Sequence, residues 1–144
     1  MSQSVTSPPP YDGRHLIADL HGCARLDDAA YIERVLRDAA AAAGATVLDV
    51  RLHAFGPGQG VTGVALLAES HISIHSWPEN GYAAIDFFLC GSRHDLEAAL
   101  NVAVTGLAAG RVERQTIARG YGVAISPSLE GRERQADHPP DDLK

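Results

Sequence analysis

Hydrophobic and polar residues alternate along much of the chain, and this two-residue period predicts strands. The clearest case is residues 71–77, where Ile72 and Ile74 share one side and His71, Ser73 and His75 share the other. Further apolar or alternating segments predict five more strands, at residues 15–20, 46–55, 61–68, 82–89 and 111–118. Residues 78–81, Pro-Glu-Asn-Gly, predict a turn between two of these segments, and the Asn80-Gly81 pair in it is typical of a hairpin.

Two other segments carry the 3.6-residue period of an amphipathic helix. The first opens at Asp27 and Asp28 and ends at Gly44; its apolar stripe is Ile32, Val35, Leu36 and Ala39. The second spans residues 95–107; its stripe is Leu96, Leu100 and Val104. The resulting order, strand–helix–strand–strand and then strand–strand–helix–strand, predicts an α+β two-layer sandwich, with an antiparallel sheet and helices packed on one of its faces.

Both ends of the chain lack this patterning. Residues 1–13 are polar and Pro-rich, and residues 126–144 combine charge with Pro, so we expect two flexible tails. The folded part is then a single domain at residues 14–125, since 144 residues are too few for two domains with separate cores.

Composition narrows the function classes. The formal net charge of -6 argues against a nucleic-acid-binding surface, which needs clustered Lys and Arg. No apolar run approaches the roughly 18 residues of a membrane span, and the first residues do not form a secretory signal. With only Cys23 and Cys90, a disulfide framework is not expected, and we predict a cytoplasmic protein in which Cys23 is structural.

The candidate chemistry lies in residues 68–91. Ser70 stands where one apolar strand gives way to the next, His75 lies on the polar side of a strand, and Cys90 ends the following strand. A hairpin at residues 80–81 predicts that Cys90 returns beside His75 and Ser70. A plain turn serine and a buried cysteine are the ordinary alternatives. A hydrolase built on these three groups is also open, although no G-x-S-x-G elbow is present.

A metal site at His71 and His75 is the other possibility. His71 and His75 are four residues apart, which on a helix would suit one zinc ion. On a strand the same spacing is about 13 Å, too far to share an ion. The isoleucine alternation favours the strand, so no metal is predicted, and the local pattern by itself leaves the chemistry undecided.

Three segments resemble prokaryotic S-adenosylmethionine decarboxylases: GRHLIADLHGC at 13–23, AGATVLDVRLHAF at 43–55, and GVTGVALLAESHISIHSWPENGYAAIDFFLCG at 60–91. The resemblance runs from about Gly13 to Gly91. It implies a self-processing proenzyme, cleaved between Glu69 and Ser70 into chains 1–69 and 70–144. Ser70 then becomes the covalent pyruvoyl cofactor, which forms a Schiff base with the substrate.

The same resemblance implies roles for four more residues. His75 corresponds to the proton acceptor in self-processing and Cys90 to the proton donor in turnover. Phe55 corresponds to an aromatic residue that stacks on the adenine of the substrate, and Glu79 to an acid that holds the ribose hydroxyls. His53 and His71 receive no role; either they line the pocket or they satisfy local polar groups.

The implied activity is conversion of S-adenosylmethionine to its decarboxylated form plus CO2, for spermidine and polyamine biosynthesis, by a homodimer of processed protomers. Decarboxylation of arginine or ornithine is the alternative on the same scaffold, and a non-catalytic regulatory homologue is a remote one. Phe55 and Glu79 favour S-adenosylmethionine. Asn80 stands where many relatives carry tyrosine, and the turn at residues 56–60 is one residue longer than in some of them.

Overall fold

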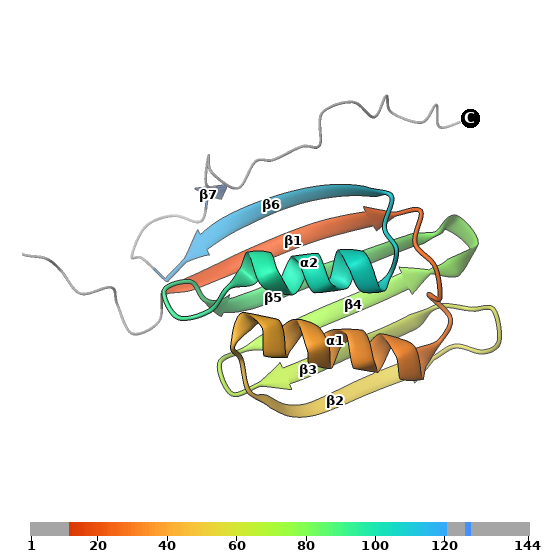
Figure 1. Cartoon of the computed structure of the whole chain (residues 1–144), viewed down its shortest axis with the longest axis horizontal. Coiled ribbons are helices and arrows are strands. Elements are labelled where there is room, and N and C mark those ends of the chain that lie inside the picture. The colour runs from red at the N-terminus through yellow and green to blue at the C-terminus, as the bar shows by residue number, and fades with distance from the viewer. Residues whose placement is uncertain (1–11, 121–125, 128–144) are drawn as a thin grey trace, which may run out of the picture.

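One antiparallel sheet dominates the computed structural model of the chain, which describes residues 12–120 and 126–127 (Figure 1). Its strands lie in the order β2-β3-β4-β5-β1-β6-β7, so β1 is flanked by β5 and β6. The strands are β1 (Gly13–His21), β2 (Val47–Ala54), β3 (Val61–Leu67), β4 (His71–Trp77), β5 (Tyr82–Cys90), β6 (Arg111–Arg119) and β7 (Ser126–Pro127). Every neighbouring pair is antiparallel.

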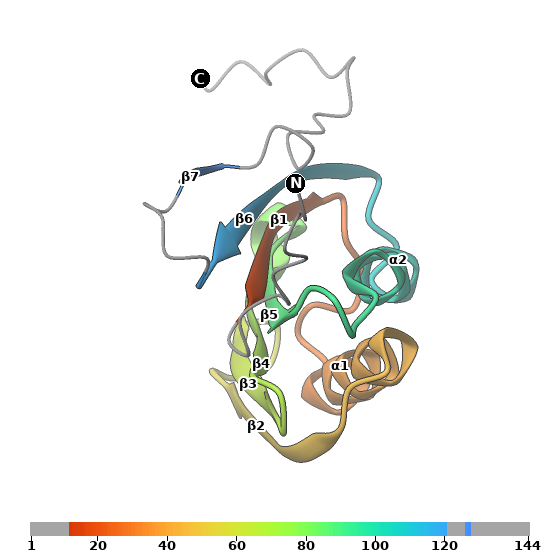
Figure 2. The same ribbon diagram turned by 90° about the vertical axis from the view of Figure 1, so that its left-hand side faces the viewer.

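Two helices, α1 (Ala29–Ala43) and α2 (Leu96–Gly106), lie side by side on the same face of this sheet (Figure 2). Each helix begins at an aspartate whose side chain accepts a backbone N–H, Asp28 from Tyr31 and Asp95 from Ala98, both at 3.0 Å. Gly44 ends α1 in the left-handed region, at φ 78°. The expected α+β sandwich with helices on one face is confirmed.

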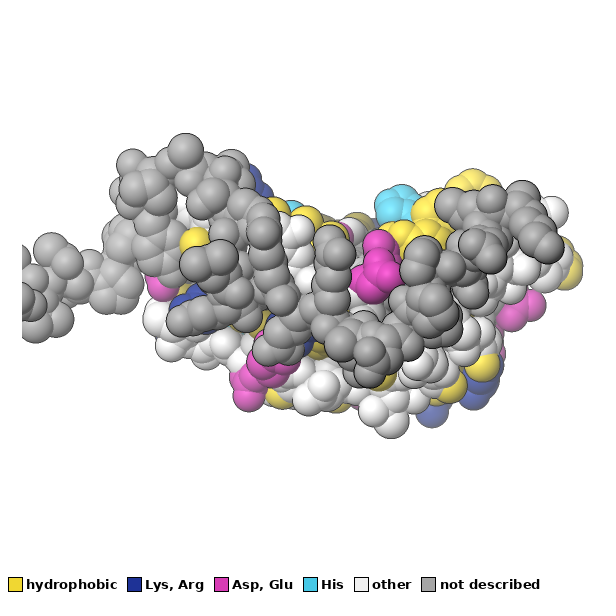
Figure 3. Space-filling view, turned by 90° about the horizontal axis from the view of Figure 1, so that it is seen from above, with side chains coloured by type: hydrophobic (Ala, Val, Ile, Leu, Met, Phe, Trp, Pro, Cys, Tyr) yellow, Lys and Arg dark blue, Asp and Glu magenta, His cyan; other side chains and the backbone are white. Residues whose placement is uncertain are grey.

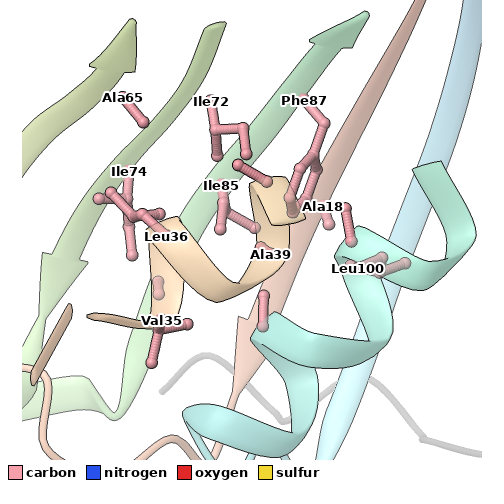
Figure 4. Packing of buried hydrophobic residues seen from close by; sticks show 14 of the residues in the cluster. Ala18, Val35, Leu36, Ala39, Ala65, Ile72, Ile74, Ile85, Phe87 and Leu100 are labelled. Atoms are coloured by element: carbon pink, nitrogen blue, oxygen red, sulfur yellow. The ribbon is translucent and has the colours of Figure 1, made fainter. Parts of the chain in front are cut away.

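The core fills the space between the helices and the sheet (Figure 4). Ile72 and Ile74 of β4 are fully buried there, opposite α1. The predicted stripe of α1 is buried throughout. On α2 the buried set is Leu96, Ala99, Leu100 and Ala103, and Val104 of the expected stripe is half-buried and packs against the same core. The two helices approach closely at Gly106 of α2, where a Cβ would lie 3.0 Å from a methyl group of Val35 on α1.

Within residues 12–120 and 126–127, no helix packs on the opposite side of the sheet (Figure 2). Strand alternation places on this open face His15, Ile17, Thr62, Val64, Leu66, His71, Ser73, His75, Trp77, Ala84, Asp86 and Phe88. Ile17, Leu66 and Trp77 are 42%, 44% and 41% exposed, although an uncovered sheet face is normally polar. The space-filling view shows exposed hydrophobic, histidine and acidic side chains around a hollow of the surface (Figure 3).

The turn between β4 and β5 forms at residues 78–81, where the sequence predicts it. Pro78–Asn80 make one turn of 3-10 helix, and only Gly81 enters the left-handed region, at φ 60°. Trp77 pairs with Tyr82 across this four-residue connection. The predicted turn at residues 78–81 and the hairpin that it closes are therefore confirmed, with Asn80 and Gly81 as the last two of its four residues.

The ends of the domain are only partly described. Residues 1–11 and 128–144, most of the two expected tails, lie outside the described residues. The backbone of β7 pairs with Ile117 and Ala118, so the sheet includes two residues of the expected C-terminal tail. The domain limits of 14–125 remain a prediction. Neither helix of the described part has the length and apolar character needed to cross a bilayer.

Candidate active site

Ser70 lies in the tight connection between β3 and β4. The Leu67 N–H donates to the Ser70 carbonyl at 2.9 Å, and the Ala68 N–H donates to the Thr46 carbonyl at the same distance. The Thr46 N–H in turn donates to Glu69 Oε1 at 3.0 Å. This last hydrogen bond, ahead of the nearby His94, lowers the pKa of the Glu69 carboxyl. The Glu69–Ser70 peptide is therefore held by hydrogen bonds on either side.

His94 connects this turn with the end of β5. Its Nε2 lies 3.6 Å from Glu69 Oε2, and its Nδ1 lies 3.1 Å from the Cys90 carbonyl oxygen. The His94 side chain is only 5% exposed, so both contacts are sheltered from water. The structure thus brings Cys90 to the Ser70 end of the sheet, through a histidine that the sequence did not single out.

The Cys90 thiol sits among three polar groups. It donates to Asp12 Oδ1 at 3.2 Å and lies 3.4 Å from Ser92 Oγ, and Arg93 Nε donates to its sulfur at 3.4 Å. The hydrogen bonds from Ser92 and Arg93 lower the pKa of Cys90. Burial instead raises the pKa of Cys23 to about 11. The two cysteines therefore differ in reactivity, which suits a working thiol at Cys90.

Replacing Arg93 by glutamine tests this assignment. Because the guanidinium stabilises the thiolate, its loss should raise the pKa of Cys90, and half-maximal alkylation by iodoacetamide should move to higher pH. Peptide mass spectrometry over a pH series measures this, with Cys23 of the same chain as the internal control. If the pH of half-maximal alkylation at Cys90 did not change, Arg93 would have no influence on the pKa of this thiol.

A second cluster lies beside Ser70 on the open face. Ser70 Oγ is 3.4 Å from His71 Nδ1, and His71 Nε2 is 3.2 Å from Asp86 Oδ2. His15 Nε2 reaches the same carboxylate oxygen at 2.6 Å, and Ser73 Oγ donates to the other oxygen, Oδ1. A continuous chain of contacts therefore runs from the Ser70 hydroxyl to a carboxylate in the centre of β5.

His15, His71 and Asp86 also present three donor atoms within 4.8 Å of one another, close enough for one metal ion. Their N···O separations of 2.6 and 3.2 Å are hydrogen-bond lengths, so the cluster is satisfied without an ion. The prediction of no metal stays a prediction: it considered only the pair His71 and His75, whereas this cluster draws on β1 and β5.

His75, Phe55 and Glu79 lie together at the other end of β4. They line an open pocket of about 560 Å³ that Trp77 also borders. His75 Nδ1 is hydrogen-bonded to Thr62 Oγ1 at 2.7 Å. Phe55 is 57% exposed and packs edge-on against His53, with ring centroids 4.7 Å apart. The pocket therefore offers an aromatic surface, an imidazole and a carboxylate to one ligand.

Within one chain, Ser70 and Cys90 are separated from the second group of expected site residues, which is His75, Phe55 and Glu79. His71 and His75 are four positions apart on β4, or about 13 Å. His75 pairs with Ala84, whereas Cys90 pairs with Gly13. The expectation that Cys90 returns beside His75 was therefore wrong, because a hairpin brings opposite each other only residues equally far from its turn.

His15, Asp86 and His94 were not identified as site residues from the sequence. Asp86 could have been identified from the sequence, since it is the only charged residue in the otherwise apolar segment 82–90. No comparable signal exists for His15, which lies 71 positions away from Asp86 and meets it only through the register of β1 with β5.

Comparison with known proteins identifies the family. The family model described as S-adenosylmethionine decarboxylase matches residues 14–120. The chain belongs to the S-adenosylmethionine decarboxylase family. The family match extends through β6, further than the resemblance in the sequence segments, which ended near Gly91.

Individual members of the S-adenosylmethionine decarboxylase family agree with this assignment. A proenzyme of that name from Thermomicrobium roseum is 44% identical over 108 residues, which cover 75% of this chain and 93% of the relative. One from Parasynechococcus marenigrum is 47% identical over 119 residues, covering 81% and 92%. The crystal structure of the adenosylmethionine decarboxylase from Aquifex aeolicus superposes with a TM-score of 0.68 at 35% identity, covering 81% of this chain and 96% of that one.

Proposed function

We propose that this chain is a proenzyme that cuts itself between Glu69 and Ser70 and then decarboxylates S-adenosylmethionine. The observation that carries the proposal is the position of Ser70. It follows Glu69 in a hydrogen-bonded turn, and His94 connects the same turn to the Cys90 end of β5. A nucleophilic hydroxyl next to a hydrogen-bonded peptide suits self-cleavage, and a thiol at the same end of the sheet suits proton delivery in turnover.

Cleavage begins with the Ser70 hydroxyl. Its oxygen attacks the carbonyl carbon of Glu69, and the peptide C–N bond breaks to give an ester and a free amine. A base then removes the proton on Ser70 Cα. The Cβ–Oγ bond of Ser70 breaks, and the main-chain carboxylate of Glu69 leaves with that oxygen. The dehydroalanine that remains takes up water and loses ammonia, which leaves a pyruvoyl group at the new terminus. His75 is the proposed base of the elimination, because a neutral imidazole suits proton abstraction near pH 7.

The pyruvoyl group would supply a ketone to hold the α-amine of the substrate and a conjugated amide carbonyl to accept the electron pair left by departing CO2. Cys90 then delivers one proton to the substrate carbon. Phe55 stacks on the adenine and Glu79 accepts hydrogen bonds from the ribose hydroxyls, in a pocket whose volume of about 560 Å³ suits a ligand of this size. The exposed ring of Phe55 is available for this contact.

The separation of the two groups within one chain leads us to propose a homodimer with its open faces packed together. A two-fold axis sets the Ser70 end of one subunit against the His75 end of its partner. Each complete site then combines Ser70 and Cys90 with His75 of the partner subunit. The exposed apolar residues Ile17, in the middle of this face, and Leu66, at its Ser70 end, would then be covered.

Substrate choice is tested by supplying S-adenosylmethionine, arginine and ornithine in parallel and measuring CO2 release. We expect release from S-adenosylmethionine alone. Phe55→Ala should raise the KM for it roughly tenfold, since a base stacked on an aromatic ring gains about 1–3 kcal/mol.

The matched control for Phe55→Ala is Leu48→Ala, which removes an exposed hydrophobic side chain that does not line the pocket. Preferred release from arginine or ornithine would assign those substrates instead, and an intact chain with no release at all would indicate a non-catalytic homologue. We place the enzyme in the cytoplasm, where Cys23 and Cys90, both free, stay reduced.

A further inference from the structure

We infer that His71, oriented by Asp86, is the base that takes the proton from Ser70 Oγ in the first step of cleavage. The inference rests on the proposed self-processing at Ser70 and adds a second histidine to it. The contact that carries it is Ser70 Oγ to His71 Nδ1, at 3.4 Å. Catalytic contacts are often this long before the reacting groups close together.

Asp86 determines which nitrogen of His71 is free. An ionised carboxylate only accepts hydrogen bonds, so the His71 Nε2 that approaches Asp86 Oδ2 carries the proton. In the neutral ring Nδ1 is then an unprotonated acceptor, and this is the atom that faces Ser70. His15 Nε2 and Ser73 Oγ donate to the same carboxylate and hold it in place. Asp86 therefore acts as a positioning residue.

The His71 ring is also fixed by its neighbours. It stacks on Phe88, with centroids 6.0 Å apart and planes at 28°, and meets the edge of His15 at 6.1 Å. Its backbone is paired with Leu66 on one side and Phe88 on the other. A ring held on all these sides loses little freedom on reacting, which favours proton transfer to it.

The proton balance uses His71 twice. Nδ1 removes the hydroxyl proton as Ser70 Oγ bonds to the Glu69 carbonyl carbon. When the C–N bond of the peptide breaks, the same proton passes from Nδ1 to the departing amide nitrogen, which becomes the free amine of Ser70. His71 ends the step unchanged, and no other reactant is needed. The later elimination is left to His75 of the partner subunit.

His75 of the same chain cannot perform this first step. It lies about 13 Å along β4 from His71, and its Nδ1 is engaged by Thr62 Oγ1 at 2.7 Å. His71 is the only described imidazole that contacts Ser70 Oγ within the chain. Because this base belongs to the same chain as Ser70, the ester can form whether or not two subunits have associated.

The test follows cleavage of newly synthesised full-length chain by intact-mass spectrometry. His71→Ala should slow cleavage about 100-fold or more, the usual contribution of a general base. Added imidazole should restore part of the rate in proportion to its concentration, which a purely structural role would not allow. Asp86→Asn keeps the shape but lets an amide donate to Nε2, so it should slow cleavage at least tenfold.

His21→Ala is the matched control, because His21 lies at the far end of β1 and stacks on Tyr82, away from Ser70. It should cleave at the wild-type rate, as should wild type in the presence of a chelator. Circular dichroism checks that each variant is folded. A wild-type cleavage rate in His71→Ala would overturn the inference, as would a slow His71→Ala variant that imidazole does not accelerate; a wild-type rate in Asp86→Asn would overturn the positioning role of Asp86.

Two further outcomes are equally informative. If a chelator stops cleavage of the wild-type chain, then His71 is a metal ligand and the inference is wrong. If the wild-type chain never cleaves between Glu69 and Ser70, the proposed function itself fails and the role of His71 fails with it. If the wild-type chain and His71→Ala both cleave at the same rate, the proposed self-processing is supported and the role of His71 is disproved.

Discussion

A chain carrying Ser70→Ala is expected to remain a single polypeptide of 144 residues and to release no CO2 from S-adenosylmethionine. Without the hydroxyl there is no nucleophile to attack the Glu69 carbonyl, and without the resulting ketone there is no electron acceptor for decarboxylation. Intact-mass spectrometry distinguishes the uncut chain from pieces 1–69 and 70–144. The expected effect is complete loss rather than a reduced rate, since the substitution removes the precursor of the cofactor.

Ser70→Thr is the matched control for this experiment. It keeps a hydroxyl at the same position and adds one methyl group, so cleavage should continue at a lower rate. Ser73→Ala is unsuitable as a control because Ser73 donates to Asp86. Cleavage of Ser70→Ala at the 69–70 bond would disprove the ester mechanism. An uncut Ser70→Ala chain with full decarboxylase activity would disprove the need for a pyruvoyl group.

Co-expression of two inactive variants should restore cleavage if the site is shared between subunits. A dimer that pairs Ser70→Ala with His75→Ala contains one site with both wild-type residues: Ser70 of the second chain and His75 of the first. Only the His75→Ala chain should be cut, and overall activity should approach half that of wild type in the mixed dimers. Two affinity tags allow isolation of mixed dimers, and mass spectrometry then shows which chain is cleaved.

The control pairs His75→Ala with a chain carrying both substitutions, which supplies no intact partner histidine and should restore nothing. If purified mixed dimers of the two single variants stay uncut, His75 acts on Ser70 of its own chain or not at all. The open-face dimer would then have to be abandoned, because it is the arrangement that brings the two ends of the sheet together.

Local patterns were sufficient to predict most of the fold. The alternation of residues 71–77 gave β4 to the residue, and the acidic opening and terminal glycine gave α1 with its buried stripe. Both signals depend on contacts between residues close in sequence. On α2 the period identified Leu96, Leu100 and Val104, which all pack in the core, but not Ala99 and Ala103, which complete the buried side.

The candidate site could be predicted only in part, because its contacts join distant strands. Ser70, Cys90 and the pair Phe55 and Glu79 were named through the family resemblance, and their roles still await experiment. The meeting of His15 with Asp86 depends on the register of β1 against β5, which no local pattern specifies. The same limit led to the mistaken proximity of Cys90 and His75, which the register of β4 with β5 excludes.

If the chain is cut after Glu69 as proposed, β1 belongs to piece 1–69 and lies between β5 and β6, which both belong to piece 70–144. Neither piece could then leave without breaking the ladders on both edges of β1, so the cut protein should stay assembled with no covalent link. After unfolding, its two pieces would meet again only by diffusion, and recovery would depend on concentration. The uncut chain keeps both sets of strands in one molecule. Folding would therefore have to precede the proposed cut, and heat damage that the uncut chain survives should become permanent in a dilute solution of the cut protein.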